Sequence, residues 1–174
     1  MVLDGDRLMA KFQFEGLDEY IAQLQKLYGD IDGTIKMAVF DGAAVVADAV
    51  RKEIEALPVT RETGTGLSLD PAGGISQTQK EGLLKGLGIT NMQNDRGVIN
   101  VKIGMEGYNG AKTRQYPNGQ PNAMIARSII SGTSQNWYKN NFPARAARAA
   151  KKAAEDAMRA RVEENIQNIM NEQE

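Results

Sequence analysis

The most regular pattern in the sequence is the long segment that follows Phe142-Pro143. Its spacing predicts an α-helix of about seven turns, and proline suits the first turn of such a helix. Because the helix is rich in alanine and the stripe is narrow, the stripe buries little area. We therefore predict a C-terminal helical arm over residues 143–174 that contacts neighbouring molecules rather than contributing to the core. The stripe consists of Ala147, Ala150, Ala154, Met158, Val162, Ile166 and Met170.

A second long helical pattern begins with Asp30 or Asp32 as its cap and ends before Pro58. Much of the surface outside its apolar face is small, which allows another helix to approach closely. A shorter helix is predicted over residues 17–28, and the two are expected to form a helical hairpin. The apolar face of the longer helix is Ile35, Val39, Val46, Val50, Ile54 and Leu57, and the small residues beside it are Gly42, Ala43, Ala47 and Ala49.

Alternation of polar and apolar residues predicts strands at residues 11–15 and 98–103, with residues 89–92 as a hairpin partner of the second strand across residues 93–97. Short helices are expected over residues 77–85 and 122–130. The prediction is an α+β fold in which a small antiparallel or mixed β-sheet packs against the helical hairpin, with long loops and a long C-terminal helix.

The 174 residues suit one domain with appendages. Residues 1–9 are expected to be a polar lead-in, residues 10–142 the body and residues 143–174 the arm. Two glycine-rich stretches, 58–75 and 104–121, are predicted to be long loops, which in compact domains are often functional. No apolar run approaches the roughly 20 residues that a membrane span needs, so no membrane contact is expected.

The chain contains no cysteine and no histidine. This composition excludes thiol nucleophiles, disulfides, Cys/His zinc sites and Ser-His-Asp triads built from this chain alone. Lys112-Thr113 follows a glycine-rich stretch but lacks the glycine directly before the lysine that a phosphate-binding loop requires. Paired carboxylates such as Asp30 and Asp32 lack the spacing of a calcium loop. We therefore expect no enzyme, no cofactor, and no catalytic, cofactor-binding or metal-binding residues; a carboxylate-based, metal-dependent enzyme is the least favoured alternative.

Charge is balanced in total, at −1, but not along the chain. Residues 1–100 contain 10 basic and 15 acidic side chains, residues 101–152 contain nine basic and one acidic, and residues 153–174 contain two basic and six acidic. Three interpretations are open: solvated scatter, electrostatic complementarity between subunits, or a nucleic-acid-binding surface over residues 102–152. The overall acidity weakens the third.

Four cations lie in the opening turns of the predicted C-terminal helix, where the helix dipole disfavours positive charge. Their clustering favours an anionic neighbour over plain solvation. Two large aromatic residues in a polar loop suggest an interface anchor, with docking onto the protein's own core as the alternative. The candidate interface residues are Arg127, Trp137, Tyr138, Lys139, Arg145, Arg148, Lys151 and Lys152.

Two parts of the sequence resemble a known family. The segment 121–131, which contains the predicted helix, runs into Gly132-Thr133-Ser134, and the step Phe142-Pro143 then begins a long charged helix. The opening, residues 12–19, reads Phe-Gln-Phe-Glu-Gly-Leu-Asp-Glu. This arrangement resembles the tail-completion, or neck, proteins of tailed double-stranded DNA bacteriophages, whose members often have an acidic residue where this chain has Ser131.

The resemblance implies a structural virion protein of the phage neck, present in the host cytoplasm during assembly. Such a protein forms a ring-shaped homo-oligomer, expected here as a hexamer, that completes the tail and joins it to the head. Its expected partners are the head-closure (stopper) protein, the tail terminator and the tail tube proteins, with genomic DNA passing through the lumen without sequence-specific binding. The alternatives are a tail terminator that caps the tail tube and a nucleic-acid-binding module.

Overall fold

The computed structural model describes residues 29, 31–96, 98–132 and 138–171, so the predicted strand at residues 11–15 and the predicted helix at 17–28 lie outside the described residues. Within them the fold is α+β, as the sequence predicted. Its elements are α2 (Ile31–Glu55), α3 (Gln77–Gly86), β1 (Leu87–Ile89), β2 (Gln93–Asp95), β3 (Val98–Asn100), β4 (Ile103–Met105), α4 (Asn122–Ser131) and α5 (Phe142–Asn171).

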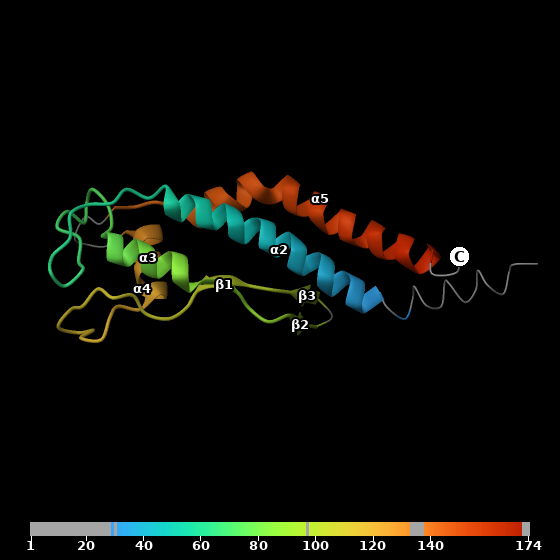
Figure 1. Cartoon of the computed structure of the whole chain (residues 1–174), viewed down its shortest axis with the longest axis horizontal. Coiled ribbons are helices and arrows are strands. Elements are labelled where there is room, and N and C mark those ends of the chain that lie inside the picture. Colours follow the sequence, from blue (N-terminus) through green and yellow to red (C-terminus); the bar gives the residue numbers. More distant parts are fainter. Residues whose placement is uncertain (1–28, 30, 97, 133–137, 172–174) are drawn as a thin grey trace, which may run out of the picture.

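Helices α2 and α5 lie side by side and antiparallel along most of the molecule (Figure 1). Near one end of the pair, Arg145 of α5 forms an ion pair with Glu53 of α2. Near the other end, Arg161 Nε lies 2.6 Å from Asp41 Oδ2. The hydrogen bond and the charge of Asp41 raise the pKa of Arg161 above its ordinary value. The pair is therefore joined by ion pairs toward both ends.

Small side chains allow these two helices to approach each other closely. Gly42 of α2 lies under Met158 of α5, and a Cβ at Gly42 would lie only 2.7 Å from Met158 Cγ. The prediction that the small surface of α2 admits another helix is confirmed, and that helix is α5. The buried residues along the two helices are mostly small: Thr34, Ala38, Gly42, Ala43 and Ala47 on α2 and Ala146, Ala150 and Ala154 on α5.

The predicted apolar face of α2 is wrong in the first half of the helix. Ile35 is 38% exposed and Val39 is half-buried, whereas their neighbours Thr34 and Ala38 are buried. Thr34 faces α5, because its hydroxyl oxygen accepts a hydrogen bond from Asn165 Nδ2 of that helix. The prediction is confirmed in the second half, where Val50, Ile54 and Leu57 are buried.

The interpretation of the C-terminal helix as an arm outside the core is wrong for its first turns. Ala146 is 1% exposed and belongs to the main hydrophobic cluster, together with Phe142, which precedes the predicted arm. Ala147, a member of the predicted apolar stripe, is exposed. The buried stripe begins one residue earlier than predicted because α5 packs on α2 of the same chain. Ile166 and Met170, near the far end, are 38% and 40% exposed.

The core lies where the end of α2, helices α3 and α4, and the start of α5 meet. We call residues 44–90, 103–132 and 138–152, which include this core, the body end. We call residues 31–43 and 153–171 the paired-helix end (Figure 1). The core cluster consists of Val50, Ile54, Leu57, Ile75, Leu83, Ile125, Ala126, Ile129, Phe142 and Ala146.

A long irregular hairpin extends from the body end. Strand β1 pairs antiparallel with β4, and β2 pairs antiparallel with β3, which makes two two-stranded sheets. Between them Thr90 N donates to Lys102 O at 2.8 Å, and Lys102 N donates to the Thr90 hydroxyl oxygen at 2.9 Å. Asn91 and Met92 then oppose Val101 alone, as in a β-bulge.

The bulge explains where the predicted strands differ from the structure. The single strand expected over residues 98–103 is interrupted at residues 101–102, and of its predicted partner at residues 89–92 only Ile89 lies in a strand, β1. The turn is also shorter than predicted, because β2 occupies part of the segment 93–97. Arg96 at this turn has a φ of 52°, in the left-handed region.

The two glycine-rich loops form no named helix or strand beyond β4, but they are tied to each other by hydrogen bonds. Lys112 N donates to Thr65 O at 2.8 Å. Fully buried Gln79, in the first turn of α3, accepts from Ser76 N at 3.1 Å and donates through Nε2 to Gln120 Oε1 at 2.9 Å. The loops and α3 therefore form one bonded unit at the body end.

Candidate interface surfaces

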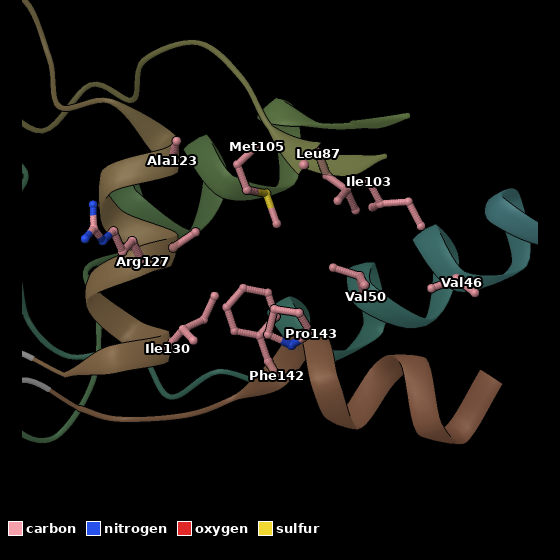
Figure 2. A pocket seen from close by; sticks show the side chains of 12 residues that line it. Val46, Val50, Leu87, Ile103, Met105, Ala123, Arg127, Ile130, Phe142 and Pro143 are labelled. Atoms are coloured by element: carbon pink, nitrogen blue, oxygen red, sulfur yellow. The ribbon is translucent and has the colours of Figure 1, made fainter. Parts of the chain in front are cut away.

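An open apolar groove of about 450 Å³ lies at the body end (Figure 2). Its walls come from α2, strands β1 and β4, helix α4 and the first turn of α5. The volume lies within the range of ligand pockets, roughly 300–1,000 Å³. The lining residues are Val46, Val50, Leu87, Ile103, Gly104, Met105, Ala123, Ala126, Arg127, Ile130, Phe142 and Pro143.

The groove exists because its wall elements converge without fully covering one another. Figure 2 shows Leu87, Ile103 and Met105 of the hairpin opposite Phe142 and Pro143 of α5. Phe142 is fully buried, whereas the three hairpin side chains are half-buried. The chain therefore leaves part of its apolar surface in water at this place, and a partner that covered this surface would gain free energy by removing it from water.

Arg127 is the charged residue of the groove lining. It is exposed on α4, and in Figure 2 its side chain points away from the apolar walls. The groove thus combines apolar walls with one cation at its rim.

The four cations at the start of α5 do not form one uniform patch. Arg145 is neutralised by Glu53 of the same chain, and Lys151 Nζ lies 3.9 Å from Glu155 Oε1 one turn further along. Arg148 and Lys152 are exposed and form no ion pair within the described part of the chain. Two of the four cations therefore have an acidic partner within this chain.

The candidate aromatic anchor divides into a described and an undescribed part. Trp137 lies outside the described residues. Tyr138 is half-buried against the core cluster, and its hydroxyl oxygen accepts from Asn140 Nδ2 at 2.8 Å. Its backbone N–H donates to Pro71 O at 2.7 Å. Tyr138 therefore docks onto its own chain, which was the alternative interpretation, while Lys139 is exposed.

Of the candidate interface residues that the structure describes, only Arg127 lies in the groove lining. The groove itself was missed by sequence reasoning. Its one detectable signal was the alternation of Ile103 and Met105 around Gly104, which predicts an apolar strand face but not what leaves that face uncovered.

The charge that is uneven along the chain is also uneven between the two ends of the folded molecule. At the body end, residues 44–90, 103–132 and 138–152 contain 13 basic and seven acidic side chains. At the paired-helix end there are three basic and six acidic side chains. The two ends of the described molecule are therefore opposite in net charge.

Exposed large apolar side chains occur at the paired-helix end. Met37 and Phe40 of α2 are 43% and 48% exposed, and they line a shallow groove with Met92 of the hairpin. Ile166 and Met170 are exposed near the end of α5. Both ends of the molecule thus present apolar surface together with charge.

Among the described residues there is no group of three or more Asp and Glu side chains that could hold a metal ion. None of the helices in the same part of the chain is long and apolar enough to cross a membrane. Comparison of the chain with protein-family models, with curated proteins and with solved structures finds no match.

Proposed function

We propose that this chain is a structural, non-enzymatic subunit of a bacteriophage neck, which forms a ring between the head-closure proteins and the tail terminator. The observation that carries the proposal is the pair of unlike surfaces at opposite ends of the subunit. A subunit of a closed ring needs two different faces that complement each other, because each copy contacts the next head to tail. An apolar groove with a basic rim at one end and an acidic, partly apolar helix end at the other meet this requirement.

The segment that resembles the neck-protein family contributes directly to one of these faces. Half of the residues that line the groove lie between residues 121 and 147. They belong to α4 and to the Phe142-Pro143 step that begins α5. The proposal thus joins the family resemblance to a surface that a partner can cover.

Electron microscopy of a lysate from a phage or prophage that lacks this gene tests the proposal. DNA-filled heads beside unattached tails of normal length are the expected result. Overlong tails would instead indicate the tail terminator, and intact virions in normal number would contradict both virion roles.

A DNA-binding module is the second candidate, because Arg148 and Lys152 are exposed without a described partner and the body end is basic. Binding to duplex DNA at low salt that falls steeply with added salt would favour it. The absence of binding at low salt would remove it.

A further inference from the structure

The end of α5 carries a small surface that matches the groove in chemistry. Glu163, Ile166 and Met170 are spaced by three and four residues, so they share one side of the helix. All three are exposed, and Glu163 forms no ion pair with any residue that the structure describes. We call these three residues the α5 tip. It presents two apolar side chains and one carboxylate.

The α5 tip cannot reach the groove of its own chain. Pro143 lines that groove, and Ile166 follows it by 23 residues within the same continuous helix. A rise of 1.5 Å per residue separates the two positions by about 35 Å. Figure 1 shows the end of α5 at the opposite end of the molecule from α3 and α4. Any groove that the tip enters therefore belongs to another copy.

We propose that the α5 tip of one copy inserts into the apolar groove of the next copy. Ile166 and Met170 lie against the apolar walls, and Glu163 lies beside Arg127 at the rim. This inference rests on the proposed neck function and makes it more specific, because it identifies the partner of the groove as a second copy of this chain.

The contact is heterologous, since the groove and the tip are different surfaces at opposite ends of one subunit. Repetition of such a contact generates a closed ring when the rotation between copies closes. One helix end covers less than the roughly 1,200 Å² of a standard stable interface. We therefore expect the contact to form in the assembled ring, where every copy contributes one tip and one groove.

Disulfide trapping in assembled particles tests the contact, because the chain has no cysteine of its own. Ala123→Cys lies at the groove edge, and Gln167→Cys lies beside Ile166; both positions are exposed. Virions in which each copy carries both substitutions should give, after oxidation, a ladder of covalent oligomers on a denaturing gel without reductant. An intrachain bridge is excluded by the separation of these positions, since bridged Cα atoms lie within about 7 Å.

The matched control pairs Ala123→Cys with Ala160→Cys, which is exposed on the same side of α5 two turns earlier. No ladder is expected from it. If particles form and contain the protein but Gln167→Cys gives no ladder, or if both pairs give the same ladder, the tip-in-groove contact is overturned while the neck function stands. If the protein is missing from the particles, the neck function itself fails.

A charge exchange tests the contact at the rim without cysteine. Arg127→Glu and Glu163→Arg should each lower the yield of joined virions by about tenfold, because each places like charges at the contact. The two substitutions combined should restore the yield. Thermal unfolding of the purified variants should match the unaltered protein, since both side chains are exposed. Normal yield from both single variants, or no recovery in the double variant, would overturn the proposal.

Discussion

Gly119 lies beneath a backbone carbonyl in the loop that follows β4. Its φ is 122°, in the region that favours glycine, and a Cβ there would lie 2.1 Å from Asn109 O. A Cβ at Gly64, in the other glycine-rich loop, would have no heavy atom of another described residue within 4 Å beyond its chain neighbours. The two glycines look alike in the sequence, but only Gly119 is required by the backbone.

Replacement of each glycine by alanine should show which of the two the backbone requires. Gly119→Ala should lower the free energy of unfolding by about 3 kcal/mol, because it adds both a clash with backbone and an unfavourable φ. Gly64→Ala should change it by less than about 0.5 kcal/mol. Chemical denaturation of the two variants measures both values, and equal effects would contradict the account.

Gln79 joins α3 to the loop that contains Gln120, and it is fully buried. Gln79→Ala should destabilise the protein by about 3 kcal/mol, because it leaves the Ser76 N–H and the side-chain Oε1 of Gln120 buried without these partners. Gln77→Ala, at an exposed position in the same turn, is the matched control and should cost less than about 0.5 kcal/mol. A loss below about 1 kcal/mol for Gln79→Ala in urea unfolding would show that the buried bonds do not hold the loops.

At the scale of elements, the helices were predictable because their signals are local. The periodicity before Pro58 predicted α2 to within two residues of its observed ends, and the spacing after Phe142 predicted α5. The packing of α2 against α5 was not predictable from such local signals. Ile35 is more hydrophobic than Thr34, yet Thr34 faces α5, because its hydroxyl oxygen accepts a hydrogen bond from Asn165 of that helix.

The groove depends on contacts that no local pattern contains. Val46, Leu87 and Phe142 are distant in the sequence and meet only when α2, the hairpin and α5 pack together. The bulge opposite Val101 also eluded prediction, because alternation along residues 98–103 reads as one unbroken strand. The candidate site was therefore predictable only in part, through Arg127 and the charge pattern of α5.

The close packing of α2 on α5 can be tested at Gly42. Gly42→Leu should lower the free energy of unfolding by about 2 kcal/mol, because Met158 occupies the space that the new side chain needs. Met158→Ala should destabilise the unaltered protein but improve the Gly42→Leu variant. A double-mutant cycle measures this coupling, for which we expect at least about 1 kcal/mol.

The control for this cycle is Lys52→Leu, at an exposed position of the same helix. It should show no coupling to Met158→Ala. If Gly42→Leu is as stable as the unaltered protein, the two helices do not pack as closely as the structure shows.

At the scale of the whole molecule, the chain is polarised: the body end is basic and the paired-helix end is acidic. Arg145 has an ion-pair partner within the chain, Glu53 of α2, so charge reversal across all four cations of α5 would also disturb the helix pair. Arg148 and Lys152 are the better probes of a partner.

Reversal of both charges, Arg148→Glu with Lys152→Glu, should reduce head–tail joining by about tenfold while the subunit still folds. The proposed function expects this loss because the substitutions remove positive charge from a surface that would contact a neighbouring subunit. The matched control, Lys36→Glu with Lys102→Glu, changes the same net charge at exposed positions away from the start of α5. Virion titre and circular dichroism of the purified subunits measure the two effects. An equal loss of titre in both variants would attribute the effect to net charge alone.

The most direct test of the proposed neck function is a cryo-electron microscopy reconstruction of the virion neck from a phage or prophage that carries this gene. We predict a ring of copies of this chain between the head-closure proteins and the tail, with the end of each α5 in the groove of the next copy. Density for the neck that contains no copy of this chain would contradict the account.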